Sequence, residues 1–224
     1  MSGNNSNSNN NGGDSNGNNG NNNANGGGGG NSNSPTLVHR KVAILGFRAV
    51  GKSSLTHSFV TGTFSEAYDP TIESVQHKTI RFRKVHFATD IVDTAGMDEF
   101  SRLSRNASLG VHGYILVFSL ISRQSFDMIS QVNDALLNTL GDAPDVPRVL
   151  VGSMKDLVGV PPNQRQVSSQ EAQSLAERWG NVPYIECSSK TGDNVAEVFH
   201  TLLKEIEKDD GLLAENEDNG CTIL

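Results

Sequence analysis

The sequence predicts an α/β domain with a six-stranded, mostly parallel sheet, one antiparallel strand and five flanking helices. Short apolar runs alternate with segments of helical periodicity across residues 36–209. Two of these runs, at 114–118 and 149–151, are apolar throughout, as expected for central parallel strands covered on both faces. Two others, at 75–82 and 85–92, lie too close together for an intervening helix and should form a hairpin.

The first elements frame a glycine-rich loop. Residues 41–45 form a short apolar strand pattern, and Leu55 and Phe59, four residues apart, mark one face of the helix behind the loop. The same alternation predicts the remaining elements. The expected strands are 40–46, 75–82, 85–92, 113–119, 148–152 and 182–187, and the expected helices are 52–60, 98–108, 123–140, 168–180 and 193–209. Ligands of such sheets bind at the carboxyl ends of the strands, so the loop is a candidate site.

Composition divides the 224 residues into three parts. Residues 1–35 are almost entirely Asn, Gly and Ser, and they cannot bury enough apolar surface to offset the entropy of ordering. We expect a disordered arm there rather than a signal peptide, because a basic start and an apolar run are missing. Residues 36–209 suit one domain with a buried core, and residues 210–224 suit a flexible acidic tail.

Charge and cysteine content argue against several functional classes. The net charge is −7 without a basic cluster, so no nucleic-acid partner is expected. The sequence contains no run of 18 apolar residues, so no membrane span is predicted. Cys187 and Cys221 fit a reducing compartment better than a disulfide framework, and the six histidines lack the spacing of metal ligands.

Residues 46–53 read GFRAVGKS and match the phosphate-binding pattern G-x-x-x-x-G-K-[ST]. Gly46 and Gly51 allow the backbone to turn its N–H groups towards phosphate oxygens. Lys52 can reach the β- and γ-phosphates, and the Ser53 hydroxyl can bind Mg²⁺. A plain glycine turn is the alternative, but the strand before the loop and the helix after it favour the phosphate site.

Two further segments carry hard-oxygen groups that suit Mg²⁺. Asp93 ends the third expected strand and could hold the ion through a water, while Gly96 offers an N–H to a γ-phosphate. Thr71, in a polar loop, could supply a second hydroxyl. Each segment alone could be a turn, but together with Ser53 they form a coherent Mg²⁺ site.

With these motifs the chain resembles the Ras superfamily of small GTPases, and most closely the Rheb family. The matching strings are 46–55, 68–73, 93–96 with 98–101, and 113–117, together with the cysteine near the C-terminus. Arg48 is the Rheb-like mark, because most Ras-like proteins have a small residue at that place in the loop. The resemblance covers residues 38–224.

The resemblance implies a GTP/GDP site with Mg²⁺ bound by Ser53, Thr71 and, through water, Asp93. Phe64 would pack against the guanine, and Tyr68 would close over the phosphates. Segments 66–75 and 94–108 would be the switches that GTP orders. The implied nucleotide-binding residues are Gly46, Arg48, Ala49, Val50, Gly51, Lys52, Ser53, Ser54, Phe64, Tyr68, Thr71, Gly96, Ser153, Met154, Asp156, Ser188, Ser189 and Lys190. The implied catalytic positions are Arg48, Tyr68, Gly96 and Met97.

Two departures from the family pattern stand out. Met97 occupies the place of the usual Gln, which orients the attacking water, so we expect slow GTP hydrolysis. The guanine motif Asn-Lys-x-Asp reads Ser153-Met154-Lys155-Asp156. Asp156 keeps the carboxylate that selects guanine, but the lost hydrogen bonds predict faster nucleotide exchange.

The chain ends Cys221-Thr-Ile-Leu224, a C-a-a-X box whose final Leu favours a geranylgeranyl group. Residues 205–218 contain seven acids and one Lys, so a second, basic membrane signal is missing. We expect reversible association of a prenylated, methylated protein with the cytoplasmic face of membranes, together with a cytosolic pool.

The resemblance implies a monomeric GTP-dependent switch that signals to the TOR kinase complex and is controlled by a GTPase-activating protein. Two alternatives remain open at this point. The chain could be a nucleotide-binding module that hardly hydrolyses GTP, or a general Ras-like regulator outside the Rheb branch.

Overall fold

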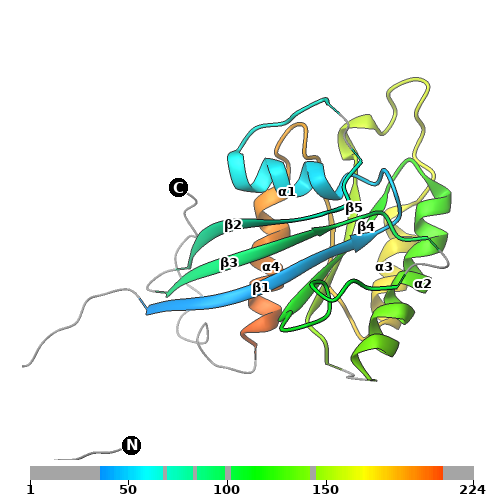
Figure 1. Cartoon of the computed structure of the whole chain (residues 1–224). Helices are drawn as coiled ribbons and strands as arrows, with labels where there is room; N and C mark the ends of the chain where they lie inside the picture. Colours follow the sequence, from blue (N-terminus) through cyan, green and yellow to red (C-terminus); the bar gives the residue numbers. More distant parts are fainter. Residues whose placement is uncertain (1–35, 68–69, 83–84, 99–101, 142–144, 209–224) are drawn as a thin grey trace, which may run out of the picture. The chain divides into compact units, whose positions relative to one another are not determined.

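The computed structural model describes residues 36–67, 70–82, 85–98, 102–141 and 145–208 (Figure 1). They form one six-stranded sheet in the order β2-β3-β1-β4-β5-β6. Its strands are β1 (Thr36–Gly46), β2 (Glu73–Phe82), β3 (Val85–Thr94), β4 (Gly113–Ser119), β5 (Arg148–Ser153) and β6 (Tyr184–Glu186). Only β2 runs antiparallel to its neighbour, in the expected hairpin with β3, so the predicted sheet is confirmed.

The described residues contain four helices rather than five. They are α1 (Lys52–Thr61), α2 (Arg123–Leu140), α3 (Ser169–Arg178) and α4 (Val195–Ile206), and a 3₁₀ turn, η1 (Lys155–Leu157), follows β5. The helix predicted at 98–108 is wrong for the described part of that segment, because residues 102–104 are irregular and 106–110 form turns. The Ser104 hydroxyl accepts from Ala107 N at 3.1 Å, and the Ser108 hydroxyl donates to Ser104 O at 3.0 Å. Such side-chain bonds to the backbone compete with a helix.

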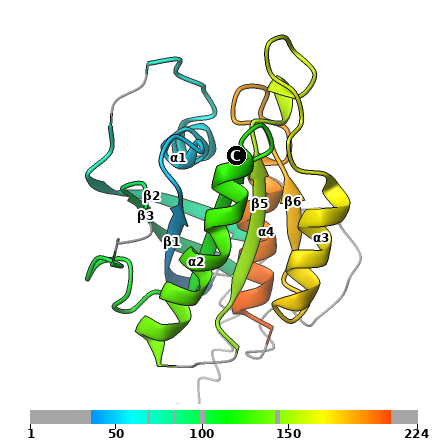
Figure 2. The ribbon, with the colours of Figure 1, turned by 90° about the vertical axis from the view of Figure 1, so that its right-hand side faces the viewer.

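Helices α1 and α4 cover one face of the sheet, and α2 and α3 cover the other (Figure 2). Strand β1 shows why the central strands are apolar at every position. Val42 and Ile44 pack with α1 and α4, whereas Ala43 and Leu45 pack with α2 and α3. Successive side chains of a strand point to opposite faces, so a strand covered on both sides needs apolar residues throughout. None of the described helices is long and apolar enough to cross a membrane.

The loop after β1 is held by close backbone packing. Gly46 has φ 154°, and a Cβ added there would lie 2.2 Å from the carbonyl oxygen of Val117, so only glycine fits against β4. Gly51, at φ 89°, is left-handed, as is Ala49 at φ 56°. These conformations turn the chain sharply between the end of β1 and the start of α1, as the phosphate-loop motif predicts.

Candidate functional site

A cavity of about 380 Å³ lies at the carboxyl ends of β1 and β3. Its walls come from three separate parts of the chain: residues 48–54, the segment with Thr71, and residues 94–96. Met154, after β5, completes the lining. The structure therefore brings together the phosphate-loop, hydroxyl and glycine positions that the motifs predicted, around a space with the size of a small-molecule site.

Lys52 is held inside this loop as a buried cation. Its Nζ donates to the carbonyl oxygens of Gly46 at 3.2 Å and Phe47 at 3.0 Å, and the residue is 6% exposed. Burial lowers the pKa of Lys52 to about 8, against the opposing pull of the Asp93 carboxylate. The ammonium group is therefore mostly charged at pH 7. Two of its three N–H donors point at carbonyls, which leaves the third for a phosphate oxygen.

The oxygen atoms predicted to hold Mg²⁺ are also together. Ser53 Oγ lies 2.7 Å from Thr71 Oγ1, and Asp93 is 2% exposed at the end of β3. Asp93 Oδ1 is buried and has no hydrogen-bond partner among the described residues. Burial raises the pKa of Asp93, while Ser53 and Lys52 lower it. A buried carboxylate oxygen without a partner is costly, so the two hydroxyls and this oxygen fit a small hard cation.

The glycine of the 93–96 segment is required by contact with the phosphate loop. A Cβ on Gly96 would lie 2.4 Å from Arg48 Cα, a clash with backbone atoms. The next residue adds a backbone bond, because Met97 N donates to Gly46 O at 3.0 Å. The end of β3 and the phosphate loop are therefore in direct contact, so a ligand that moves one segment must also affect the other.

Ser153 joins the expected base-reading segment to the phosphate loop. Its hydroxyl lies 2.6 Å from Val50 O and 2.9 Å from Phe118 O, and it is buried at the end of β5. Met154, left-handed at φ 60°, accepts a hydrogen bond at Sδ from the Ser119 hydroxyl at 3.2 Å. The serine thus still links β5 to the phosphate loop, through a shorter side chain than the asparagine of the family pattern.

Asp156 is oriented by a serine from the loop after β6. Ser188 Oγ donates to Asp156 Oδ1 at 2.6 Å, and Thr191 N donates to the same hydroxyl at 3.2 Å. The backbone adds a further bond, from Lys155 N to Cys187 O at 3.1 Å. The carboxylate is therefore fixed at the end of the sheet where the parallel strands finish, although it lies outside the lining of the 380 Å³ cavity.

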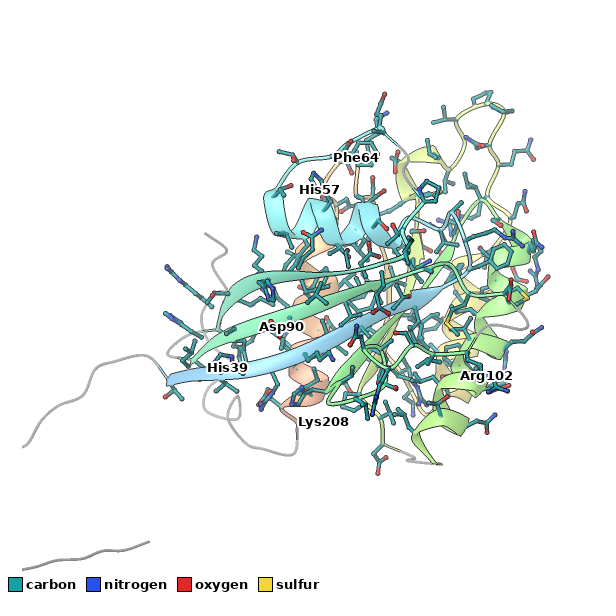
Figure 3. The ribbon with its side chains drawn as sticks, in the orientation of Figure 1. His39, His57, Phe64, Asp90, Arg102 and Lys208 are labelled. Carbon is teal, nitrogen blue, oxygen red and sulfur yellow. The ribbon has the colours of Figure 1, made fainter. Side chains whose placement is uncertain are left out.

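The remaining base-side residues lie outside that cavity as well. Phe64 is 37% exposed in the connection after α1 (Figure 3). On the same connection Glu66 accepts from Lys190 Nζ at 3.2 Å, which links it to the loop that holds Ser188 and Ser189. Both charged side chains are largely exposed, so this pair adds little stability. Tyr68 lies outside the described residues.

Comparison with known proteins identifies the family. The model of the Ras family matches residues 41–208. The chain belongs to the Ras family. It is 41% identical over 186 residues to a GTP-binding Rheb homolog of Dictyostelium discoideum, covering 83% of this chain and 97% of that protein. It is 47% identical over 169 residues to the small GTPase RhbA of Aspergillus fumigatus, covering 75% of this chain and 88% of that protein. It is 40% identical over 190 residues to human Rheb, covering 85% of this chain and 100% of that protein.

The protein is therefore a Rheb-like small GTPase, and the members of this family are GTP hydrolases. Small GTPases bind GTP or GDP with Mg²⁺, and the Ser53–Thr71 hydroxyl pair beside Asp93 fits that ion. Sequence reasoning missed several supporting contacts of this Ras-family site. They are the bonds from Ser188 to Asp156, from Ser119 to Met154, and from Ser104 and Asn106 to Glu73. No sequence signal indicates these contacts, because each joins polar residues whose proximity depends on the fold.

The Met97 side chain lies in the apolar core, whereas a catalytic side chain would have to face the nucleotide site. The side chain is 6% exposed and packs in the apolar cluster beneath α2, with Leu45, Val92 and Phe118 among its members. It is absent from the lining of the 380 Å³ cavity. The backbone of this position lies against the phosphate loop, whereas its side chain belongs to the core.

Replacing Met97 by Gln should therefore not restore fast hydrolysis. The amide would enter an apolar cluster, so we expect single-turnover GTP hydrolysis within about threefold of the unchanged protein and a loss of about 1–3 kcal/mol of unfolding free energy. Met97→Leu is the matched control and should cost less than about 1.5 kcal/mol. A tenfold faster single-turnover rate in Met97→Gln would show that this side chain reaches the attacking water.

Proposed function

We propose that this Rheb-like GTPase is a switch whose GTP-bound form signals to a TOR kinase complex. It hydrolyses its bound GTP slowly unless a GTPase-activating protein accelerates the reaction. The switch is supported by the proximity of the Ser53 and Thr71 hydroxyls to buried Lys52 and to Asp93, whose Oδ1 has no hydrogen-bond partner among the described residues. The Rheb relatives support the signalling part of the proposal.

In this proposal each residue has a distinct task at the phosphates. Lys52 and the N–H groups of the loop hold the β- and γ-phosphates, and the Gly96 N–H contacts the γ-phosphate. Ser53 and Thr71 bind Mg²⁺ directly, and Asp93 holds it through water. When bound, the ion neutralises negative charge that develops on the phosphate oxygens. Thr71 thereby makes its segment sensitive to the γ-phosphate.

The same segment presents the surface that changes with the nucleotide. Ile72, next to Thr71, is 90% exposed, and Glu73 begins β2. The Glu73 carboxylate accepts from the Ser104 hydroxyl and from Asn106 Nδ2 at 2.6 Å. This contact joins the two proposed switches, so a ligand that orders Thr71 also biases residues 104–106. An apolar side chain at the centre of this surface suits contact with an effector protein.

Slow hydrolysis follows from what the described residues offer near the γ-phosphate. Met97 is turned into the core, and Arg48 is exposed, with its guanidinium 5.2 Å from the Phe47 ring centroid. The Met97 side chain is therefore not positioned to hold an attacking water, whereas Arg48 lines the 380 Å³ cavity. A protein that binds nucleotide but hardly hydrolyses it is therefore the alternative that the burial of Met97 favours.

Nucleotide content and turnover, measured on one purified sample of the full chain, test the proposal. We expect GTP or GDP at about one equivalent after denaturation and chromatography. Single-turnover hydrolysis should be slow but measurable, and it should stop when Mg²⁺ is chelated. Absence of bound guanine nucleotide, with no binding in a calorimetric titration, would refute the switch. Bound GTP that remains intact for days would instead support the non-hydrolysing module.

Replacing Ser153 by Ala should loosen the nucleotide. The change removes the hydroxyl that bridges to Val50 O and Phe118 O, so the link between β5 and the phosphate loop is lost. We expect a loss of about 1–3 kcal/mol of unfolding free energy and release of fluorescent GDP about tenfold faster in stopped-flow measurements. Ser174→Ala, on α3 and outside the cavity lining, should leave release unchanged. Equal release rates for the two variants would exclude the bridge as a determinant of exchange.

For the termini, we propose a low-complexity Asn/Gly/Ser-rich arm at residues 1–35 that is separate from the GTPase domain, and a prenyl group on Cys221 in the tail 210–224. Both segments lie outside the described residues. The acidic stretch before the box supports weak, reversible membrane association. Fractionation of cells that express the chain, and of cells that express Cys221→Ser, checks this. We expect a membrane pool only for the unchanged protein, and a protein wholly in the plasma membrane would contradict reversible association.

A further inference from the structure

A second cavity, of about 510 Å³, lies at the other end of the sheet from the phosphate loop. It is formed where residues 145–148 enter β5, where residues 179–183 lead into β6, and where residues 205–208 end α4. Figure 2 shows these ends of β5, α3 and α4 side by side, and Figure 3 places Lys208 at the opposite end of the molecule from Phe64. Strand β5 runs from this cavity to Ser153, so its six residues separate the two sites by about 17 Å.

Arg148 is the unusual residue of this second cavity. It is 7% exposed, and its Nη2 donates to Trp179 O at 3.0 Å. Its Nε and Nη1 are buried and have no hydrogen-bond partner among the described residues. Burial lowers the pKa of the guanidinium from 12.5, but an arginine starts so far above neutrality that the group stays charged. A buried cation with two unsatisfied donors is expensive unless an acceptor reaches it.

The nearby acids do not satisfy this cation in the described part of the chain. Glu205 lies beside Lys208, with 3.8 Å between Glu205 Oε2 and Lys208 Nζ, and Asp145 is exposed at the rim of the cavity. Lys208 itself is largely exposed and adds a second positive charge to the lining. The cavity is therefore lined by a buried guanidinium, two of whose nitrogens lack a partner among the described residues, and by an exposed ammonium, with room for more than a water molecule.

We propose that this cavity binds a phosphate group, with Arg148 as its buried anchor and Lys208 at its rim. A guanidinium presents N–H donors in a planar fork that matches the oxygens of a phosphate, and a lysine ammonium acts as a point charge beside it. The volume exceeds that of inorganic phosphate, so a phosphate ester fits. The phosphate comes either from a soluble compound or from a lipid headgroup. This cavity is separate from the phosphate loop, which lies at the other end of β5.

Thermal unfolding of the full chain tests the site. The protein is first saturated with GDP and Mg²⁺, so that added phosphate cannot act through the phosphate loop. We expect saturating inorganic phosphate to raise Tm by about 3–6 °C above the Tm in sodium chloride of equal ionic strength. Arg148→Met should abolish this shift. Arg178→Met removes an exposed arginine of α3 that does not line the cavity, and it should preserve the shift.

A second measurement uses only the unchanged protein, so it does not require the Arg148 variant to fold. In ¹⁵N-labelled wild-type protein with GDP and Mg²⁺, one arginine Nε–H signal should move in a saturable way as phosphate is added. A Tm rise no larger than that from chloride would overturn the proposal. So would an equal rise in Arg148→Met, or arginine signals that do not respond.

Vesicles separate the two sources of phosphate. Unprenylated full chain is sedimented with phosphatidylcholine vesicles, whose zwitterionic headgroup presents a phosphodiester without net charge. Binding that Arg148→Met abolishes and Arg178→Met preserves would assign a lipid headgroup. Absence of vesicle binding, together with the phosphate-dependent Tm rise, would assign a soluble phosphate compound. Both results support the site, and they are independent of whether the chain signals to TOR.

Discussion

Replacing Asp156 by Asn should change the preferred base from guanine to xanthine. The Asp156 carboxylate, held by Ser188 at 2.6 Å, is proposed to accept two hydrogen bonds from the guanine edge. Asn offers one acceptor and one donor, which suits the additional carbonyl of xanthine and opposes the amino group of guanine. With two charge-assisted bonds weakened, we expect GDP affinity to fall about 10²- to 10⁴-fold.

Competition between fluorescent GDP and either GDP or xanthosine diphosphate measures this change directly. Asp193→Asn is the matched control, because it makes the same chemical change in an exposed acid that pairs with Lys155 at 2.7 Å. The control should keep GDP affinity within about threefold, as expected for an exposed pair. Unchanged GDP affinity in Asp156→Asn would mean that another residue selects the base.

Replacing Lys52 by Met should abolish tight nucleotide binding while the domain remains folded. Methionine preserves much of the buried stem but removes the ammonium that lies at the phosphate loop. Loss of one partner from a buried, hydrogen-bonded charge pair costs about 2–5 kcal/mol, or about 30- to 5,000-fold in affinity. Stability should change less, because the lost bonds to Gly46 and Phe47 are partly offset by relief of the burial that lowers the pKa of Lys52 to about 8.

Isothermal titration with GDP and Mg²⁺, together with urea unfolding of the nucleotide-free protein, separates the two effects. Lys155→Met serves as the control, because that lysine is exposed and paired with Asp193 outside the phosphate loop. The control should bind GDP nearly as well as the unchanged protein. If affinity and stability fell in parallel in Lys52→Met, the lysine would be a structural residue rather than a phosphate ligand.

Much of the fold could be predicted because its signals are local. The apolar runs of β4 and β5 indicate strands covered on both faces, and the short gap before β3 requires a hairpin. The segment at 98–108 was the failure. Its described residues form turns in which Ser104 bonds to nearby backbone and to Glu73 of β2. The second of these contacts spans 31 positions, so no helical periodicity can represent it.

The candidate site divides in the same way. The phosphate loop and the hard-oxygen set of Ser53, Thr71 and Asp93 could be predicted from the sequence, because glycine dihedrals and ligand chemistry belong to single residues and short spacings. Only the folded structure shows that Met97 enters the core and that Arg148 is buried with Nε and Nη1 unsatisfied among the described residues. Burial and hydrogen-bond partners depend on which distant segments share a face of the sheet, and that information exists only once the chain has folded.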